Sequence, residues 1–295
     1  DQTASMQIML KDDDLGKGYD LVNLFDPGDF LGVFGTVMIS KTGEITVQAS
    51  KFTILGKSLR PLPSTWQGIE DPETRYRKRY LDMIINPEVK KTLDARWLIE
   101  KEIRRYMQDQ QNFIEVETPV LQPLYGGTNA RPFTTHMNAL DSDFYLRVAP
   151  ELYLKRLIIG GYERIFEIAR NFRNEGIDHT HQPEFTMMEW YEAYADYQRV
   201  MDVAEGLIKH LASKLYGVSK IKVGEHEVDL DGAWPRITMT DALKKFEHLD
   251  VEKLSDVQLQ KELDRRDLHL AGSYTRGKAI FALFDHTVTS KLIQP

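Results

Sequence analysis

The sequence predicts an α+β protein in which an all-β N-terminal part precedes a larger region of helices and antiparallel strands. Residues 1 to about 60 contain short apolar and β-branched runs separated by turn residues, a pattern typical of a small β-barrel. Asp71-Pro72 and Asn86-Pro87 are helix start signals, because each joins a capping side chain to a first-turn proline. Residues 164–194 hold two strand-like runs joined by a polar loop, which predicts a hairpin.

Length and composition narrow the class of protein. The 295 residues suffice for one large or two ordinary domains, and 42% hydrophobic with 28% charged residues is typical of a globular chain. The net charge of −7 argues against a nucleic-acid-binding field over the whole surface but allows a local basic patch. With no cysteine, no membrane-spanning window and no signal-peptide pattern, we expect a soluble cytoplasmic protein without a membrane partner.

The N-terminal strands are expected at residues 6–10, 29–39 and 44–55, with a hairpin turn at 41–43. Gly32 and Gly35 inside a strand predict bulges or bends. A five-stranded oligonucleotide-binding (OB) barrel without its first strand or two fits this pattern, and an SH3-like or other small barrel fits nearly as well.

We assign residues 1–60 to the barrel and 61–86 to a linker and a basic helix. The helix's basic residues form either a solvated face or a phosphate contact: Arg75, Arg77, Lys78 and Arg79.

Residues 87–295 form the second predicted domain. A helix over residues 87–111 has two apolar faces, which suggests burial against the core and against another subunit. The strand that follows is interrupted by Pro119, which belongs at an edge, a strand end or an interface. Further helices are expected at 152–159, 202–216, 242–248, 256–265 and 278–292, with a helical insertion at about 220–275.

The predicted hairpin could place several functional groups on one face. Arg173 and Glu175 alternate onto the same face of the first run. One face of the second run carries Phe185, Met187, Glu189 and Tyr191. If the two faces coincide, the sheet holds a guanidinium, two carboxylates, a phenyl ring and a phenol. Two interpretations stay open: a surface hairpin with one ion pair, or a site that binds an anion, a planar base and a cation side by side.

Several familiar sites are absent from the sequence. It has no P-loop and no Gly-x-Gly-x-x-Gly motif, so neither kind of nucleotide-binding loop is supported. His179, His181 and Glu184 could approach a metal, but they lack a further well-placed ligand, and we do not favour a metal site there.

Two longer motifs carry a family resemblance. Residues 172–175 with His181, Phe185 and Glu189 resemble motif 2 of the class II aminoacyl-tRNA synthetases. Residues 111–119 resemble motif 1, whose helix and strand form the dimer interface in that class, which implies a homodimer with Pro119 at its interface. Within the class the chain is similar to lysyl-tRNA synthetases, on residues 126–133, 147–156 and 183–196. The similarity runs from about Gln7 to the end of the chain.

The resemblance implies an activity and its participants. Members of that family use ATP and Mg²⁺ to convert L-lysine to lysyl-adenylate and transfer the lysine to tRNA(Lys) in cytoplasmic protein synthesis. It also implies an anticodon-binding OB barrel followed by a class II antiparallel sheet flanked by helices. Two alternatives remain: a non-catalytic tRNA-binding or regulatory fragment, and a lysine-activating paralogue that modifies a protein.

The resemblance also implies roles for individual residues. Arg173 is similar to the catalytic arginine that grips the ATP α-phosphate and the amino-acid carboxylate. The other residues implied in ATP binding are Asn174, Glu175, His181, Gln182 and Phe185. Those implied in lysine binding are Gly126, Glu151, Glu189 and Tyr191. In the barrel, Gln7 corresponds to an anticodon-reading glutamine, whereas Lys51 stands where some relatives have an anticodon-reading glutamate.

One family motif has no match in this sequence. Motif 3, with its arginine and the metal-binding carboxylates, would follow Pro295. We therefore expect this chain by itself to be a poor or inactive enzyme, and its metal ligands stay unassigned.

Overall fold

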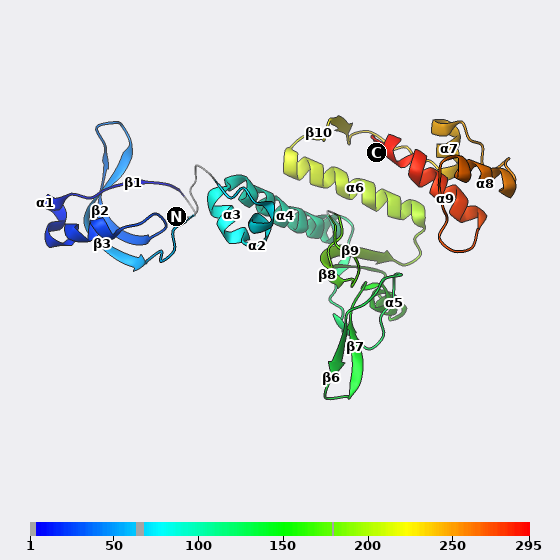
Figure 1. Cartoon of the computed structure of the whole chain (residues 1–295), viewed down its shortest axis with the longest axis horizontal. Coiled ribbons are helices and arrows are strands. Elements are labelled where there is room, and N and C mark those ends of the chain that lie inside the picture. Colours follow the sequence, from blue (N-terminus) through cyan, green and yellow to red (C-terminus); the bar gives the residue numbers. More distant parts are fainter. Residues whose placement is uncertain (1–3, 63–67, 179) are drawn as a thin grey trace. The chain divides into compact units, whose positions relative to one another are not determined.

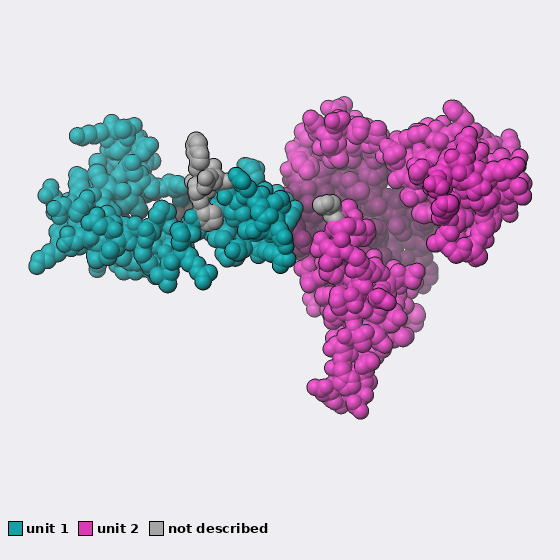
Figure 2. All heavy atoms as spheres, viewed as in Figure 1, with its two compact units in different colours: residues 1–94 teal, residues 95–295 magenta. Residues whose placement is uncertain are grey.

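The chain forms two compact units, Asp1–Asp94 and Ala95–Pro295, shown in different colours in Figure 2. The computed structural model describes residues 4–62, 68–178 and 180–295. The end of the predicted proline-containing linker at Pro63, and His179 of the candidate metal group, lie outside the described residues. The boundary between the units falls within helix α4 (Pro87–Arg105).

The first unit is built on a small, curved sheet (Figure 1). Strands β1 (Gln7–Met9), β2 (Phe30–Ile39) and β3 (Ile45–Gly56) have the order β1-β3-β2, with β1 parallel and β2 antiparallel to β3. The helix α1 (Asp12–Leu15) and a 3₁₀ segment (Gly16–Leu24) connect β1 to β2. The three predicted strands and the turn are confirmed, since Ser40 N–H donates to the Glu44 carbonyl at 2.8 Å across the turn.

Gly35 produces a bulge in β2. The register of β2 on β3 shifts between Phe34 and Gly35, and a Cβ at Gly35 would overlap the Gln48 carbonyl oxygen. Only glycine allows this approach of the two backbones. Gly32 is not at a bulge, because the other register shift falls between Phe30 and Leu31.

Two short helices, α2 (Pro72–Arg77) and α3 (Arg79–Ile85), follow the sheet. Asp71 caps α2 as predicted, accepting from the Thr74 N–H at 2.9 Å. The side chain of Asp82 is fully buried and accepts from Arg75 Nε and Arg79 Nη1, each at 2.9 Å. Two of the four basic residues therefore hold a buried carboxylate, which favours a structural role for this part of the basic cluster.

The second unit contains a sheet of β4 (Ile114–Glu115), β8 (Arg164–Phe172) and β9 (Glu184–Glu192) in the order β4-β8-β9. Its core also takes residues from a π-helical turn (Tyr106–Gln110) that follows α4, and from α6 (Tyr197–Tyr216). The buried members of this core are Tyr106, Met107, Phe113, Phe166, Val203 and Leu207. The helix predicted to continue to residue 111 is an α-helix to Arg105 followed by the π-helical turn. Trp97, on the second apolar face predicted for this helix, is 61% exposed.

A second antiparallel sheet of β5 (Leu121–Gln122), β7 (Ser142–Leu146) and β6 (Thr134–Met137) precedes helix α5 (Glu151–Ile159). Pro119 lies between the ends of β4 and β5, as a residue without an N–H donor requires. Its carbonyl accepts from Gln122 Nε2 at 3.0 Å.

The C-terminal part begins with the hairpin β10 (Lys220–Val223) and β11 (His226–Asp229). Helices α7 (Met239–Glu247), α8 (Asp256–Arg265) and α9 (Arg276–Thr287) and a 3₁₀ turn (Thr289–Lys291) follow. The three helices share one apolar core, which reaches Val288 and so extends past the predicted limit of the insertion at about 275. No helix in the described parts of the chain is long and apolar enough to cross a membrane.

The bulge predicts a difference between two glycines of the first unit. Gly35→Ala should lower the free energy of unfolding by about 1–3 kcal/mol, because the new methyl group overlaps backbone atoms of β3. Gly18→Ala is the matched control, since no atom lies within 4 Å of a Cβ there. Chemical denaturation of both variants checks this, and equal stability would contradict the role given to Gly35.

Candidate functional site

The pairing of β8 with β9 sorts their side chains onto two faces. Phe166 and Ile168 of β8, with Met188 and Trp190 of β9, pack into the helix-covered core. The paired residues between them therefore face the other side. That face carries Ile165, Glu167, Ala169 and Asn171 opposite Tyr191, Glu189, Met187 and Phe185. The prediction that Phe185, Met187, Glu189 and Tyr191 share one face of the second strand is confirmed, whereas β8 ends at Phe172, before the predicted positions of Arg173 and Glu175.

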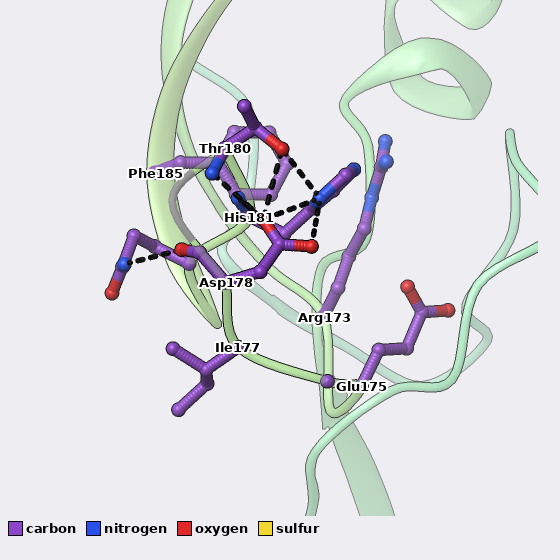
Figure 3. A pocket seen from close by; sticks show the side chains of 9 residues that line it. Arg173, Glu175, Ile177, Asp178, Thr180, His181 and Phe185 are labelled. Carbon is purple, nitrogen blue, oxygen red and sulfur yellow. Dashed lines mark hydrogen bonds and ion pairs between the residues drawn. The ribbon is translucent and has the colours of Figure 1, made fainter.

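A cavity of about 410 Å³ lies at the end of this hairpin (Figure 3). Its lining residues are Arg173, Glu175, Gly176, Ile177, Asp178, Thr180, His181, Gln182 and Phe185. The Arg173 guanidinium carbon lies 5.0 Å from the centroid of the Phe185 ring. A cation and an aromatic ring therefore stand together in a pocket of the size that holds small ligands.

Arg173 is positioned by the end of the ladder. Its N–H donates to the Pro183 carbonyl at 2.8 Å, one step beyond the last strand pair. Its buried Nε atom makes no hydrogen bond to any described residue. A bound anion would give this Nε atom the acceptor that no described residue provides.

Glu175 is not part of the strand, contrary to the predicted alternation with Arg173. It follows β8 in the connecting loop, and its Oε1 accepts from the Arg131 N–H at 3.1 Å. Asn174 donates its N–H to the Arg131 carbonyl at 2.8 Å and is not among the pocket-lining residues. Arg131 thus holds both residues through its backbone.

Asp178 is a pocket residue that sequence reasoning missed. Its Oδ1 accepts from the N–H groups of Thr180 and His181 at 2.7 and 2.8 Å and lies 2.9 Å from His181 Nδ1. The Thr180 N–H in particular holds the pKa of the Asp178 carboxyl well below its usual range. Figure 3 shows the three side chains gathered beside Arg173. An aspartate two residues before a polar residue in a loop is the signal for such a turn.

Glu189 and Tyr191 form the other half of the face. The Tyr191 hydroxyl donates to Glu189 Oε2 at 3.2 Å. Burial raises the pKa of the Glu189 carboxyl, and the charges of Glu151 and Glu167 add to the shift, while the Tyr191 hydrogen bond and Arg173 oppose it. Burial also raises the pKa of Tyr191 well above its usual value. A partly buried carboxylate among other carboxylates is a place where a bound cation would be stabilised.

The remaining predicted lysine-site residues lie at the start of α5. Glu151 is the first residue of α5 and forms an ion pair with Lys155. A Cβ at Gly126 would lie 2.8 Å from Leu152 Cδ1, and one at Gly127 would lie 2.8 Å from Glu151 Cβ. Gly127 also has a φ of +96°, so the close approach predicted for this loop is an approach to α5.

The predicted anticodon residue lies in the first unit. Gln7 Oε1 accepts from Thr46 Oγ1 at 2.6 Å, and Gln7 lines a cavity of about 660 Å³ together with residues of β1, β2 and the 40–42 turn. Lys51 is exposed and pairs with Phe34 in the sheet register.

The described residues contain no group of three or more His, Asp or Glu side chains that could hold a metal ion.

Comparison with protein families accounts for most of the chain. Residues 71–286 match the family model described as tRNA synthetases class II (D, K and N). The chain belongs to the class II tRNA synthetases. Residues 1–55 match the model described as OB-fold nucleic acid binding domain, which decides between the two barrel types that the strand pattern left open. The family predicted from motifs 1 and 2 is therefore confirmed.

Curated relatives of this class II synthetase chain carry the name lysine–tRNA ligase. The protein of Thermoanaerobacter sp. (strain X514) is 46% identical over 297 residues, covering 100% of this chain and 59% of the relative. The protein of Pelotomaculum thermopropionicum is 47% identical over 299 residues, with the same coverage. The protein of Clostridium tetani is 44% identical over 303 residues, covering 100% of this chain and 60% of the relative. The chain thus spans about three fifths of the length of these relatives.

The Asp178 turn predicts local protection of the pocket loop. In Asp178→Ala the amides of Thr180 and His181 should exchange with solvent faster, because both donate to the lost carboxylate. Asp178→Asn should keep part of the protection, since an acceptor oxygen remains. Because the pKa of Asp178 is lowered, the native protection should persist below pH 4. Hydrogen exchange that is unchanged in both variants would contradict the role of this turn.

Proposed function

We propose that this protein activates L-lysine with ATP to form lysyl-adenylate and transfers the lysine to tRNA(Lys). One observation carries the proposal. The same face of the β8–β9 hairpin presents Arg173 and Phe185 at one end and Glu189 with Tyr191 towards the other. An anion, a planar ring and a cation are the three groups that adenylation of lysine brings together. The curated relatives, which are named lysine–tRNA ligase, agree with it.

The cavity end of the site would hold ATP. Arg173, whose buried Nε has no hydrogen-bond partner among the described residues, is suited to the α-phosphate and the lysine carboxylate, where it would stabilise the charge that develops at phosphorus. The Phe185 ring would stack on adenine, a contact worth about 1–3 kcal/mol in base–aromatic platforms. Glu175 would accept from the adenine amino group. Gln182 and His181 line the same cavity and would contact the nucleotide. Asn174, held through its backbone, would flank the nucleotide from outside the cavity lining.

The other end would hold lysine. Glu189 and Tyr191 would receive the ε-ammonium, which would supply the positive charge that the partly buried Glu189 lacks. Glu151, at the start of α5, would take the α-ammonium, and the Gly126 backbone would flank it. Chemistry in this arrangement depends on positioning and charge stabilisation, with no protein nucleophile.

The partners follow from the same proposal. The OB-fold unit, with Gln7 at its cavity, would bind the anticodon of tRNA(Lys). The segment around Pro119, with the exposed apolar face of α4 at Trp97, would form a homodimer interface. We place the protein in the cytoplasm, where tRNA is charged for translation. Mg²⁺ would enter with ATP and neutralise its phosphates, and none of the roles above depends on it.

The direct test is lysine-dependent exchange of pyrophosphate into ATP by the protein at its full natural length, followed by charging of tRNA(Lys). Exchange and charging together are the expected result. Exchange without charging would support a lysine-activating enzyme that modifies a protein. Absence of exchange would support a non-catalytic tRNA-binding role and would overturn the proposal.

Removing the charge of Glu189 tests the lysine end. Glu189→Gln should weaken lysine binding by about 2–5 kcal/mol, because the bound ammonium loses its counter-charge. Glu184→Gln, on the opposite face of β9 and 57% exposed at its side chain, is the control and should bind lysine normally. The KM for lysine in the exchange reaction measures both, and an unchanged KM in Glu189→Gln would remove this residue from the site.

Lys51 tests the anticodon end. Lys51→Glu should change discrimination among tRNA anticodons more than it changes the rate of adenylation, because the residue lies in the OB-fold unit and not on the β8–β9 face. Charging rates with tRNA(Lys) and anticodon variants, compared with the exchange rate, measure the two effects separately. If neither changes, Lys51 is a surface residue without a role in recognition.

A further inference from the structure

Behind the proposed lysine end lies a buried ion pair that has no assigned role. Arg147 Nη1 donates to Glu167 Oε1 at 2.6 Å, and both side chains are about 95% buried. The Thr118 hydroxyl donates to the other oxygen of Glu167 at 2.6 Å. Arg147 Nε donates to the Arg170 carbonyl at 2.8 Å, so the guanidinium is anchored to β8 as well as to the carboxylate.

Glu167 stands directly opposite Glu189 in the pairing of β8 with β9. Like charges at directly opposed positions of two strands destabilise each other. Without a cation beside Glu167, the negative charge of Glu167 would oppose ionisation of Glu189 on the facing strand. Arg147 and Thr118 donate hydrogen bonds to Glu167, whereas the Tyr191 hydroxyl donates a hydrogen bond to Glu189.

We propose that Arg147 is a positioning residue for amino-acid specificity: by neutralising Glu167, it leaves Glu189 as the ionised carboxylate that a cationic substrate side chain completes. The inference rests on the proposed function, because it assigns the origin of the selectivity of that site for lysine. Arg147 does not touch the substrate. It acts through the charge balance of the paired glutamates.

The proposed balance of charge among Arg147, Glu167 and Glu189 predicts changes in the KM for lysine that a general loss of structure would not produce. In Arg147→Met the unpaired Glu167 opposes ionisation of Glu189. The KM for lysine should then rise about tenfold, the change that one pKa unit of interaction produces. In Glu167→Gln the unpaired Arg147 charge would repel the ammonium and raise the KM to a similar extent. The double variant Arg147→Met/Glu167→Gln carries neither excess charge and should return to within about threefold of the wild type.

The pH profile separates the two single variants. The groups that face Glu189 are Glu167 on β8, Glu151 on α5, Arg173 after β8 and Tyr191 on β9. In Arg147→Met the KM for lysine should fall as the pH rises, since higher pH favours the ionised form of Glu189 against the charge of Glu167. In Glu167→Gln the KM should change little over the same range. The KM for ATP should stay within about twofold in both variants, because the nucleotide end is unchanged.

Arg164→Met is the matched control. Arg164 pairs with Glu192 at 2.8 Å on the same two strands, but these residues occupy even-numbered positions and face the opposite side from Glu189. The control loses an ion pair between the same two strands, Glu192 keeps Arg199 as its second partner, and the KM for lysine should not change. Circular dichroism melting shows which variants fold, and Glu167→Gln, which keeps the shape of the side chain, carries the test if Arg147→Met does not fold.

Three results would overturn the inference: an unchanged KM for lysine in folded Arg147→Met, an unchanged KM in Glu167→Gln, or a double variant as impaired as Arg147→Met. In each of these the wild-type protein still performs lysine-dependent exchange. Failure of the wild type to perform exchange would instead overturn the proposed function, so the two outcomes are distinguishable.

Discussion

The register between β8 and β9 is the constraint on which the site depends. Because side chains alternate along a strand, this register sends Phe166 and Trp190 into the helix-covered core and turns Glu189 towards the open face. A shift of one residue would bury the charged positions against apolar helices. The packing energy of the core therefore fixes the orientation of the binding groups, and the fold and the chemistry are set by the same pairing.

The open face combines satisfied and unsatisfied charges. Arg147 and Glu167 complete each other, as buried ions must. Arg173 Nε has no hydrogen-bond partner among the described residues, and Glu189 has a phenol as its recorded hydrogen-bond donor. A buried donor without an acceptor and a partly buried carboxylate are both stabilised when a ligand group of opposite charge binds. The positions of Arg173 and Glu189 thus favour a ligand that is anionic at one end and cationic at the other.

The sequence predicted the bounds of a helix well where a capping side chain next to the helix was identified. Helix α8 has the predicted bounds, 256–265, because a capping box between Ser255 and Gln258 fixes its start. Helix α6 begins at Tyr197, before the predicted 202, because the Asp196 cap was missed. The Arg147–Glu167 pair could not be predicted, since it joins residues twenty positions apart whose meeting depends on the tertiary fold. The family resemblance predicted the roles of the site residues. The alternation of side chains along a strand predicted only that Phe185, Met187, Glu189 and Tyr191 share one face.

The central claim is that one face of the β8–β9 hairpin binds the nucleotide and the lysine side chain together. A crystal structure of the protein at its full natural length with lysine and a non-hydrolysable ATP analogue tests it most directly. Adenine should lie on the Phe185 ring, the α-phosphate at Arg173 and the ε-ammonium within hydrogen-bonding distance of Glu189 and Tyr191. An amino acid bound away from Glu189, or a nucleotide bound outside the cavity at Arg173, would contradict it.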